Sequence, residues 1–314
     1  MSKRYQDIKD RLRSMYSSLH TTKAMKAEAA AKLRLTQARA MAGREYMDYI
    51  RNFTEELLNV QPKHFTIAPE MQALMRAERD IKTTGLLVLG ADRGLAGNYN
   101  SLLEKQMETE YENCRKAEKE PLFLPAGKKA ERFLRKKKWP LKKIRSLSDL
   151  PDAEEAKALN NYLIKCYSDG ELDEIKILLH RFYSPGKQAL GSVDYLPFRF
   201  EEAAGSSAEE AEDIRAKEAR FTEFDPDYST ILQELFSFYL QAFIHQMMLE
   251  SKGSEQIYRL RAMTQASDNA EDLIKELEIE FNRSRQEHIT EEMIEIINAG
   301  QNEDSDGRER PDTL

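Results

Sequence analysis

The sequence predicts a mixed α+β fold in which a long antiparallel coiled coil of N- and C-terminal helices carries a small α/β domain. Three observations predict it: a seam of helical spacing at each end of the chain, short apolar runs alternating with helical stretches between them, and opposite net charges on the two ends. The 314 residues include 33% charged residues but only 10 prolines and 13 glycines. That composition favours long, solvated helices over many turns.

The N-terminal segment 1–60 is predicted to form one helix. Its seam residues recur at alternating steps of four and three, as in a coiled coil, and no proline interrupts them before Pro62. About 55 helical residues would span roughly 80 Å, which is too long for a helix inside a compact domain. The seam consists of Ile8, Leu12, Met15, Leu19, Thr22, Lys26, Ala29, Leu33, Thr36, Ala40, Gly43, Met47 and Ile50.

The C-terminal segment 226–300 is predicted to form the second helix. Its run 231–250 is richer in apolar residues, so we expect it to be more fully buried. Asp225 or Asp227 would cap its start, Gly300 would cap its end, and 301–314 is expected to be a disordered acidic tail. The later seam consists of Leu260, Met263, Ser267, Ala270, Ile274, Leu277, Phe281, Ser284 and His288.

The charges of the two ends are opposite. Residues 1–51 carry 12 Lys and Arg against 5 Asp and Glu, whereas residues 209–300 carry 9 against 21. Two helices with narrow apolar seams and opposite net charges can bury both seams by pairing with each other, and we expect the pair to be antiparallel. A basic arm for nucleic acid is the competing interpretation of the first segment, and it is weaker because that segment has an apolar pattern of its own.

Between the helices, strands and helices alternate. Short apolar runs at 85–89, 121–127, 174–184 and 193–200 predict strands, and the stretches 101–120 and 154–170 predict helices. This order predicts a small Rossmann-like α/β domain over 83–200 with a largely parallel sheet. The segments 61–82 and 201–225 are predicted to be linkers.

Catalytic and cofactor motifs are mostly absent from the sequence. No G-x-x-x-x-G-K-[ST] phosphate loop occurs, and Gly90, Gly94 and Gly97 follow a strand in a spacing that favours a structural turn over a nucleotide site. The five histidines are scattered, and Cys114 and Cys166 form no C-x-x-C motif. We therefore expect no catalytic residue, no metal site and no cofactor. No apolar run of about 18 residues suggests a membrane span, and the first residues do not look like a secretory signal.

The segment 128–145 is strongly basic, with 10 Lys and Arg and one Glu interleaved with Phe133 and Trp139. A phosphate or nucleic-acid patch is one interpretation. A solvated helix face beside a strand, with the aromatic rings in the core, is favoured because the rest of the chain adds no second basic stripe.

Three stretches resemble one protein family. They are TKAMKAEAAAKLRLTQ at 22–37, LGADRGLAGNYN at 89–100, and the long signature from Ser254 to Gly300 that contains Asp-Asn-Ala and Asn-Arg-x-Arg-Gln. By these stretches the chain is identified as a member of the gamma subunits of F-type ATP synthases. The likeness runs nearly from end to end, although Thr21 and Ala27-Glu28 depart from the usual apolar residues.

The resemblance implies a non-catalytic rotor shaft. In the family, the two terminal helices turn inside a hexamer of alpha and beta subunits, and the α/β domain contacts the epsilon subunit and the c-ring. The chain would couple ion-driven rotation of the c-ring to ATP synthesis or hydrolysis, and would be peripheral on the cytoplasmic face of a bacterial plasma membrane. A gamma-type subunit of a second, sodium-coupled ATPase and a coiled-coil adaptor without a rotary role are the alternatives.

The resemblance also assigns residues. The implied contacts with the catalytic hexamer are Lys23, Met25, Arg285, Gln286 and Thr290. The implied structural loop contains Asp92, Arg93, Gly94, Gly97 and Asn100. Without the resemblance, Arg285 and Gln286 would be interpreted as part of a solvated helix face.

Overall fold

The computed structural model describes residues 3–59, 69–75, 81–184, 186–198 and 228–306. The chain divides into two compact units, the first formed by Met1–Glu28 with Arg261–Leu314 and the second by Ala29–Leu260. The long helices α1 (Lys3–Asn59) and α7 (Tyr228–Asp306) each contribute to both units. Every predicted seam position in both helices is buried or half-buried, whereas the positions between them in the first unit are mostly exposed.

In the first unit, α1 and α7 pair in antiparallel fashion. Tyr5 stacks on Phe281 with ring centroids 5.1 Å apart. Further along α1, the Thr22 hydroxyl accepts a hydrogen bond of 3.0 Å from Ser267. Residue numbers rise along α1 as they fall along α7, so the predicted antiparallel pairing is confirmed within this unit.

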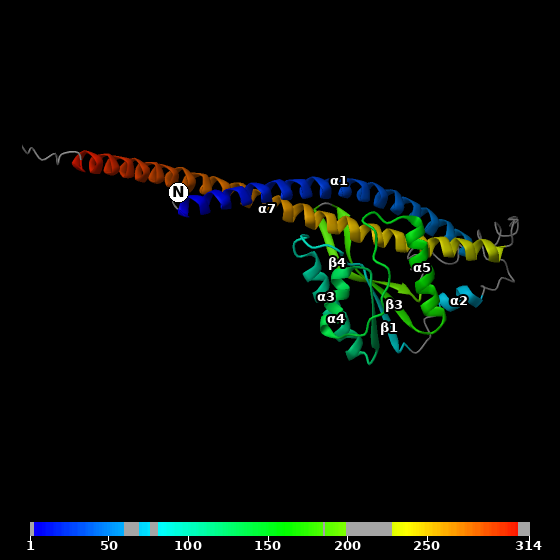
Figure 1. Cartoon of the computed structure of the whole chain (residues 1–314). Coiled ribbons are helices and arrows are strands. Elements are labelled where there is room, and N and C mark those ends of the chain that lie inside the picture. The colour runs from blue at the N-terminus through cyan, green and yellow to red at the C-terminus, as the bar shows by residue number, and fades with distance from the viewer. Residues whose placement is uncertain (1–2, 60–68, 76–80, 185, 199–227, 307–314) are drawn as a thin grey trace, which may run out of the picture. The chain divides into compact units, whose positions relative to one another are not determined.

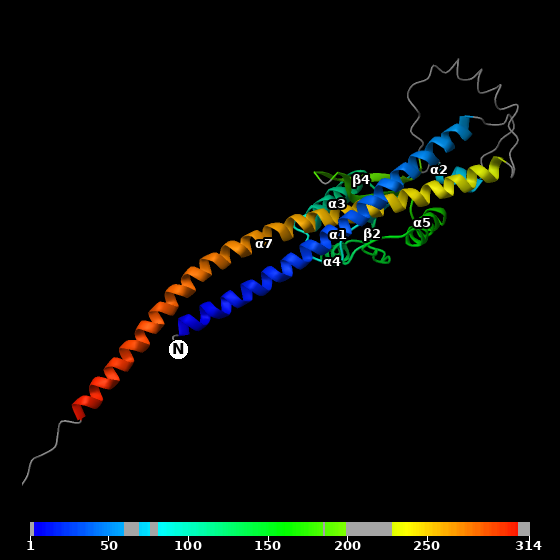
Figure 2. The same ribbon diagram turned by 90° about the horizontal axis from the view of Figure 1, so that it is seen from above.

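The same direction of pairing holds in the second unit, where Figures 1 and 2 show α1 and α7 side by side. The Tyr228 hydroxyl donates to the carbonyl of Leu57 at 2.7 Å. Gly43 allows a close approach, because a Cβ atom there would lie 2.6 Å from Oε1 of Gln246.

The second unit also contains a four-stranded sheet in the order β2-β1-β3-β4. Strands β1 (Thr83–Val88), β2 (Glu120–Pro125) and β3 (Glu174–Ser184) are parallel, and β4 (Lys187–Leu196) runs antiparallel to β3. The largely parallel sheet is as predicted. The fourth strand, however, begins at Lys187 and not at 193, because this edge strand is half-exposed and has no clear apolar alternation.

Helices cover both faces of the sheet (Figure 1). Leu86 and Val88 of β1 pack with residues of α3 (Tyr99–Lys116) and α4 (Lys128–Lys137). Leu87, the intervening residue, belongs to the core that α5 (Ala153–Ser168) and α7 share. The alternation follows from the two-residue period of a strand, and it explains why the run from Leu86 to Val88 in β1 is apolar on both faces.

The element boundaries also differ from the predictions at α2 and at the end of α7. Helix α2 (Pro69–Met75) lies within the predicted linker 61–82, and the Phe198 amide donates to its Leu74 carbonyl at 2.8 Å. Helix α7 continues through Gly300 to Asp306, so Gly300 is not its cap and 301–306 are not disordered. A glycine inside a helix costs only about 1 kcal/mol, which good helix formers on either side offset. The predicted caps Asp225 and Asp227, the linker 201–225 and residues 307–314 lie outside the described residues.

Candidate functional site: the loop between β1 and α3

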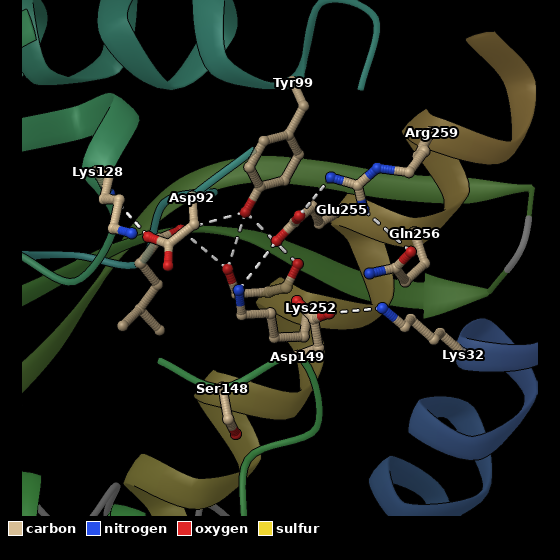
Figure 3. Close-up of polar contacts among 12 residues, drawn as sticks. Lys32, Asp92, Tyr99, Lys128, Ser148, Asp149, Lys252, Glu255, Gln256 and Arg259 are labelled. Carbon is tan, nitrogen blue, oxygen red and sulfur yellow. Dashed lines mark hydrogen bonds and ion pairs between the residues drawn. The ribbon is translucent and has the colours of Figure 1, made fainter. Parts of the chain in front are cut away.

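The loop 89–100 lies at the carboxyl ends of the parallel strands. Strand β1 is central, with β2 on one side and β3 on the other. The connection that leaves β1 leads to one neighbour, and the connection that leaves β2 leads to the other, so the two connections separate at the carboxyl end of β1. In open α/β sheets, ligands bind in the crevice at such a switch point. In this chain the crevice contains side chains of α7, as Figure 3 shows.

Tyr99, the first residue of α3, is fully buried in this crevice. Its hydroxyl lies 2.9 Å from Oγ of Ser251, and Ser251 donates to the Leu89 carbonyl at 2.9 Å. The Tyr99 ring stacks on His180 at 4.3 Å, and a ring nitrogen of His180 bonds the Tyr99 carbonyl at 2.9 Å. Burial raises the pKa of Tyr99, so its hydroxyl remains a neutral hydrogen-bonding group.

A buried ion cluster on α7 lies next to Tyr99. Glu255 accepts hydrogen bonds from Lys252 at 3.1 Å and from Arg259 at 2.7 Å. The side chains of Lys252 and Glu255 are both only 3% exposed, and that of Arg259 is 10% exposed. Buried charges are tolerated only when they are paired and hydrogen-bonded. The three residues therefore depend on one another.

Asp92 occupies the N-terminus of α4. Its Oδ1 atom accepts a hydrogen bond of 2.8 Å from the backbone amide of Lys128. The free amides and dipole at a helix N-terminus attract anions, and this is how phosphate-binding loops hold their ligand. Here the anion is a carboxylate of the chain itself. This contact fits a structural role for the loop, and that role stays a prediction.

The glycines of this region have different physical roles. Gly97 has a φ of 52°, a conformation that side chains adopt at a cost. Gly127 is required by packing, since a Cβ atom there would lie 2.6 Å from the backbone of Gly90. Gly94 has only the Lys129 side chain nearby, at 3.8 Å. The loop residues Arg93 and Asn100 are exposed and half-buried, respectively.

Two ion pairs connect the α/β domain to the helix pair of the second unit. Nζ of Lys32 on α1 lies 2.5 Å from Oδ2 of Asp149, and this bond lowers the pKa of the Asp149 carboxyl. Arg44 on α1 bonds the buried Glu250 of α7 at 3.0 Å, and Arg181 on β3 bonds the other carboxylate oxygen at 3.4 Å. Sequence reasoning missed these pairs. The only signal was that charged residues lie beside the apolar seam.

The residues that the family resemblance assigns to hexamer contacts lie in the first unit. Lys23 pairs with Glu271 at 2.7 Å, with side chains 56% and 44% exposed, and Met25 is half-buried. Arg285 and Gln286 are exposed. The hydroxyl of Thr290 donates to the Gln286 carbonyl at 2.8 Å, within its own helix. Their roles toward other subunits remain predictions.

Among the described residues, no group of three or more His, Cys, Asp or Glu side chains is placed to hold a metal ion. In the same part of the chain, no helix combines the length and the hydropathy that crossing a membrane requires.

Residues 4–301 match the model of the family described as ATP synthase. The ATP synthase gamma chain of Moorella thermoacetica is 32% identical over 294 residues, which cover 93% of this chain and 96% of that one. The chain belongs to the ATP synthase gamma chain family. The gamma chain of Brevibacillus brevis is 31% identical over 306 residues, covering 96% of this chain and 99% of that one.

Solved structures share the gamma-chain fold. A chain from the Euglena gracilis mitochondrial ATP synthase rotor superposes with a TM-score of 0.61 at 16% identity, covering 91% of this chain and 98% of that one. A chain from the Tetrahymena thermophila central stalk and c-ring gives 0.53 at 20% identity, with coverage of 79% and 99%. The family resemblance and the fold inferred from the sequence are confirmed.

Proposed function

We propose that this chain is the central rotor stalk subunit of an F-type ATP synthase, coupling rotation of the c-ring to ATP synthesis or hydrolysis in the catalytic hexamer. Membership of the gamma chain family over nearly the whole length carries the proposal. The antiparallel pairing of α1 and α7 within each unit supports it, because a paired helix resists twisting and bending better than a single one.

The proposed partners are the alpha and beta subunits of the hexamer, the epsilon subunit and the c-ring. The solved relatives come from assemblies described as central stalk with c-ring, and as F1 with c-ring. We place the chain on the cytoplasmic face of a bacterial plasma membrane, held there through the complex.

The chain itself contributes no catalytic residue in this proposal. Side chains of α7 occupy the crevice in which α/β sheets bind nucleotides, and Asp92 occupies the helix N-terminus that would bind a phosphate. Catalysis would belong to the hexamer. The role of this chain would be to present different side chains to each of the surrounding subunits.

The proposed hexamer contacts are Lys23, Met25, Arg285, Gln286 and Thr290. Arg285 and Gln286 are the strongest of these, because both side chains are exposed on α7 and carry hydrogen-bond donors. Lys23 already has an acidic partner in Glu271, and a contact with another subunit would have to compete with that pair or extend it.

Reconstitution tests the proposal directly. The chain is co-expressed with alpha, beta, epsilon and c subunits from the same organism, and the purified complex is immobilised through the hexamer. A probe attached to the α/β domain is expected to rotate in steps when ATP is added. Co-purification without rotation would favour an adaptor role, and failure to co-purify with alpha and beta subunits would refute the proposal.

A further inference from the structure

One buried carboxylate of α7 joins three separate elements of the second unit. The side chain of Glu250 is 2% exposed. Its Oε1 atom accepts hydrogen bonds of 3.3 and 3.0 Å from Arg44 on α1 and one of 3.0 Å from Gln246 on α7. Its Oε2 atom accepts one of 3.4 Å from Arg181 on β3. Arg44 also donates to the carbonyl of Phe182 on β3. Glu250 therefore connects both long helices with the sheet.

The same three elements also meet in a small apolar cluster. Its buried members are Leu33 of α1, Phe182 of β3 and Ile257 of α7. On α1, Arg44 follows Leu33 by 11 residues, which is roughly 16 Å of helix. The α/β domain is therefore attached to the helix pair at two separated places. Two such attachments together resist a pivoting motion about either one.

The chemistry of the polar attachment differs from that of the apolar one. The hydrophobic effect is non-directional, so packed apolar side chains can shift with little change in buried area. A carboxylate that accepts hydrogen bonds from several charged donors fixes both distance and direction. Stability alone does not require a charge here, because apolar residues of similar volume often stabilise a buried site equally well. The advantage of Glu250 is that it fixes the position of the α/β domain relative to α1 and α7.

We propose that Glu250 is a positioning residue for torque transfer. It holds the α/β domain and the two helices in one arrangement, so that rotation of the helices reaches the domain without angular slack. Coupling between distant sites is carried by hydrogen-bond networks and rigid elements of this kind. Glu250 acts through Arg44 and Arg181. The proposal rests on the proposed function, because torque passes through the chain only if it is a rotor.

Angular fluctuation of a rotating probe tests this role in the reconstituted complex. The hexamer is immobilised and the probe is attached to the α/β domain, so that the junction lies between the two. During each pause, the variance of the probe angle is inversely proportional to the torsional stiffness. Glu250→Gln leaves the cations of Arg44 and Arg181 on either side of a neutral side chain. It should increase the variance at least about twofold.

Glu255→Gln is the matched control. Glu255 is another carboxylate of α7 with two cationic partners, and its side chain is 3% exposed, but both partners lie on α7 itself. Those partners are more deeply buried than Arg44 and Arg181. Glu255→Gln should therefore lower the melting temperature of the chain at least as much as Glu250→Gln does, yet leave the angular variance unchanged. The comparison separates an effect on stability from an effect on stiffness.

A second variant covers the case in which Glu250→Gln does not fold. Arg44→Gln removes the attachment from the side of α1 and leaves Glu250 paired with Arg181. It should also increase the angular variance at least about twofold. Where both single variants fold, the double variant should show no larger variance than the larger of the two, because residues of one network do not act additively.

The outcomes separate the two proposals. If the complex rotates and the angular variance of Glu250→Gln and Arg44→Gln equals that of the unchanged chain, the positioning role is refuted and the rotor proposal stands. An equal increase in Glu255→Gln would also refute it, since stiffness would then follow stability in general. If the unchanged chain does not co-purify with alpha and beta subunits or does not rotate, the proposed function fails, and the positioning role fails with it.

Discussion

At the scale of single residues, the polar groups buried beside β1 depend on one another. Glu255 pairs with both Lys252 and Arg259 in the crevice, and Tyr99 and His180 stack beside them. Each of these groups costs free energy to bury, and each is stabilised only by its partners.

Glu255→Ala should lower the free energy of unfolding by about 3–5 kcal/mol, because it leaves two buried cations without a partner. Asp272→Ala is the control. It removes an exposed ion pair with Lys275, and such pairs contribute at most about 1 kcal/mol. The free energy of unfolding is measured in urea for both variants. The fluorescence of Trp139 reports the unfolding of the first variant, and circular dichroism reports that of the second. Equal, small effects would contradict the cluster's structural role.

His180 should make stability depend on pH. Burial lowers its pKa from 6.5 to about 4, so between these values the unfolded state binds more protons than the folded state. Its contribution to stability is complete above pH 6.5 and is lost as the pH falls toward 4. His180→Gln should therefore flatten the pH dependence of the urea midpoint in this window. If the urea midpoint changed with pH in the same way for the unchanged chain and for His180→Gln, His180 would not titrate as described.

Arg285→Ala with Gln286→Ala should slow ATPase turnover of the reconstituted complex by about tenfold to a hundredfold. A hydrogen bond to a charged group is worth about 1.5–3 kcal/mol, which sets this range. Thermal melting of the isolated chain should hardly change, because exposed helix positions contribute within about 0.5 kcal/mol. Unchanged turnover in a fully assembled complex would show that the two residues make no such contact.

At the scale of elements, close backbone approach decides which glycines are essential. Gly127→Ala should destabilise the second unit by about 1–3 kcal/mol, because its Cβ atom would lie 2.6 Å from the Gly90 backbone, which cannot swing away. Gly191→Ala on β4 is the matched control, with nothing within 4 Å of the added atom. Its urea midpoint should stay unchanged or rise slightly. If Gly127→Ala left the free energy of unfolding unchanged, the backbone at Gly90 would be able to move away from the added Cβ atom.

At the scale of the whole molecule, α7 ends in a stretch whose apolar side chains are left uncovered. Ile289, Met293, Ile294, Ile296 and Ile297 are all exposed. In the isolated chain, amides of 289–297 should exchange hydrogen faster than those of 244–257, where nearly every side chain is buried. In the assembled complex the difference should shrink. Strong protection of 289–297 in the isolated chain would show that the stretch needs no partner.

Features that depend on local periodicity could be predicted from the amino-acid sequence. The seams of α1 and α7 were predictable because an a/d repeat fixes which side chains share a helix face, whatever the partner. The first three strands were predictable because each contains a short apolar run that is buried on both faces of the sheet. The edge strand β4 and the end of α7 carry no such constraint, and they were misplaced.

The residues that occupy the crevice beside β1 could not be predicted in this way, because they come together only in the folded chain. Ser251 reaches the Leu89 carbonyl across 162 positions of chain, and Lys32 reaches Asp149 across 117. No periodic pattern records such pairs, because a polar residue in a helix has the same local signature whether it faces solvent or a buried partner. Which of the two it faces depends on how the helix packs against the sheet. That packing is set by the total apolar surface that the two hydrophobic clusters of the domain remove from water.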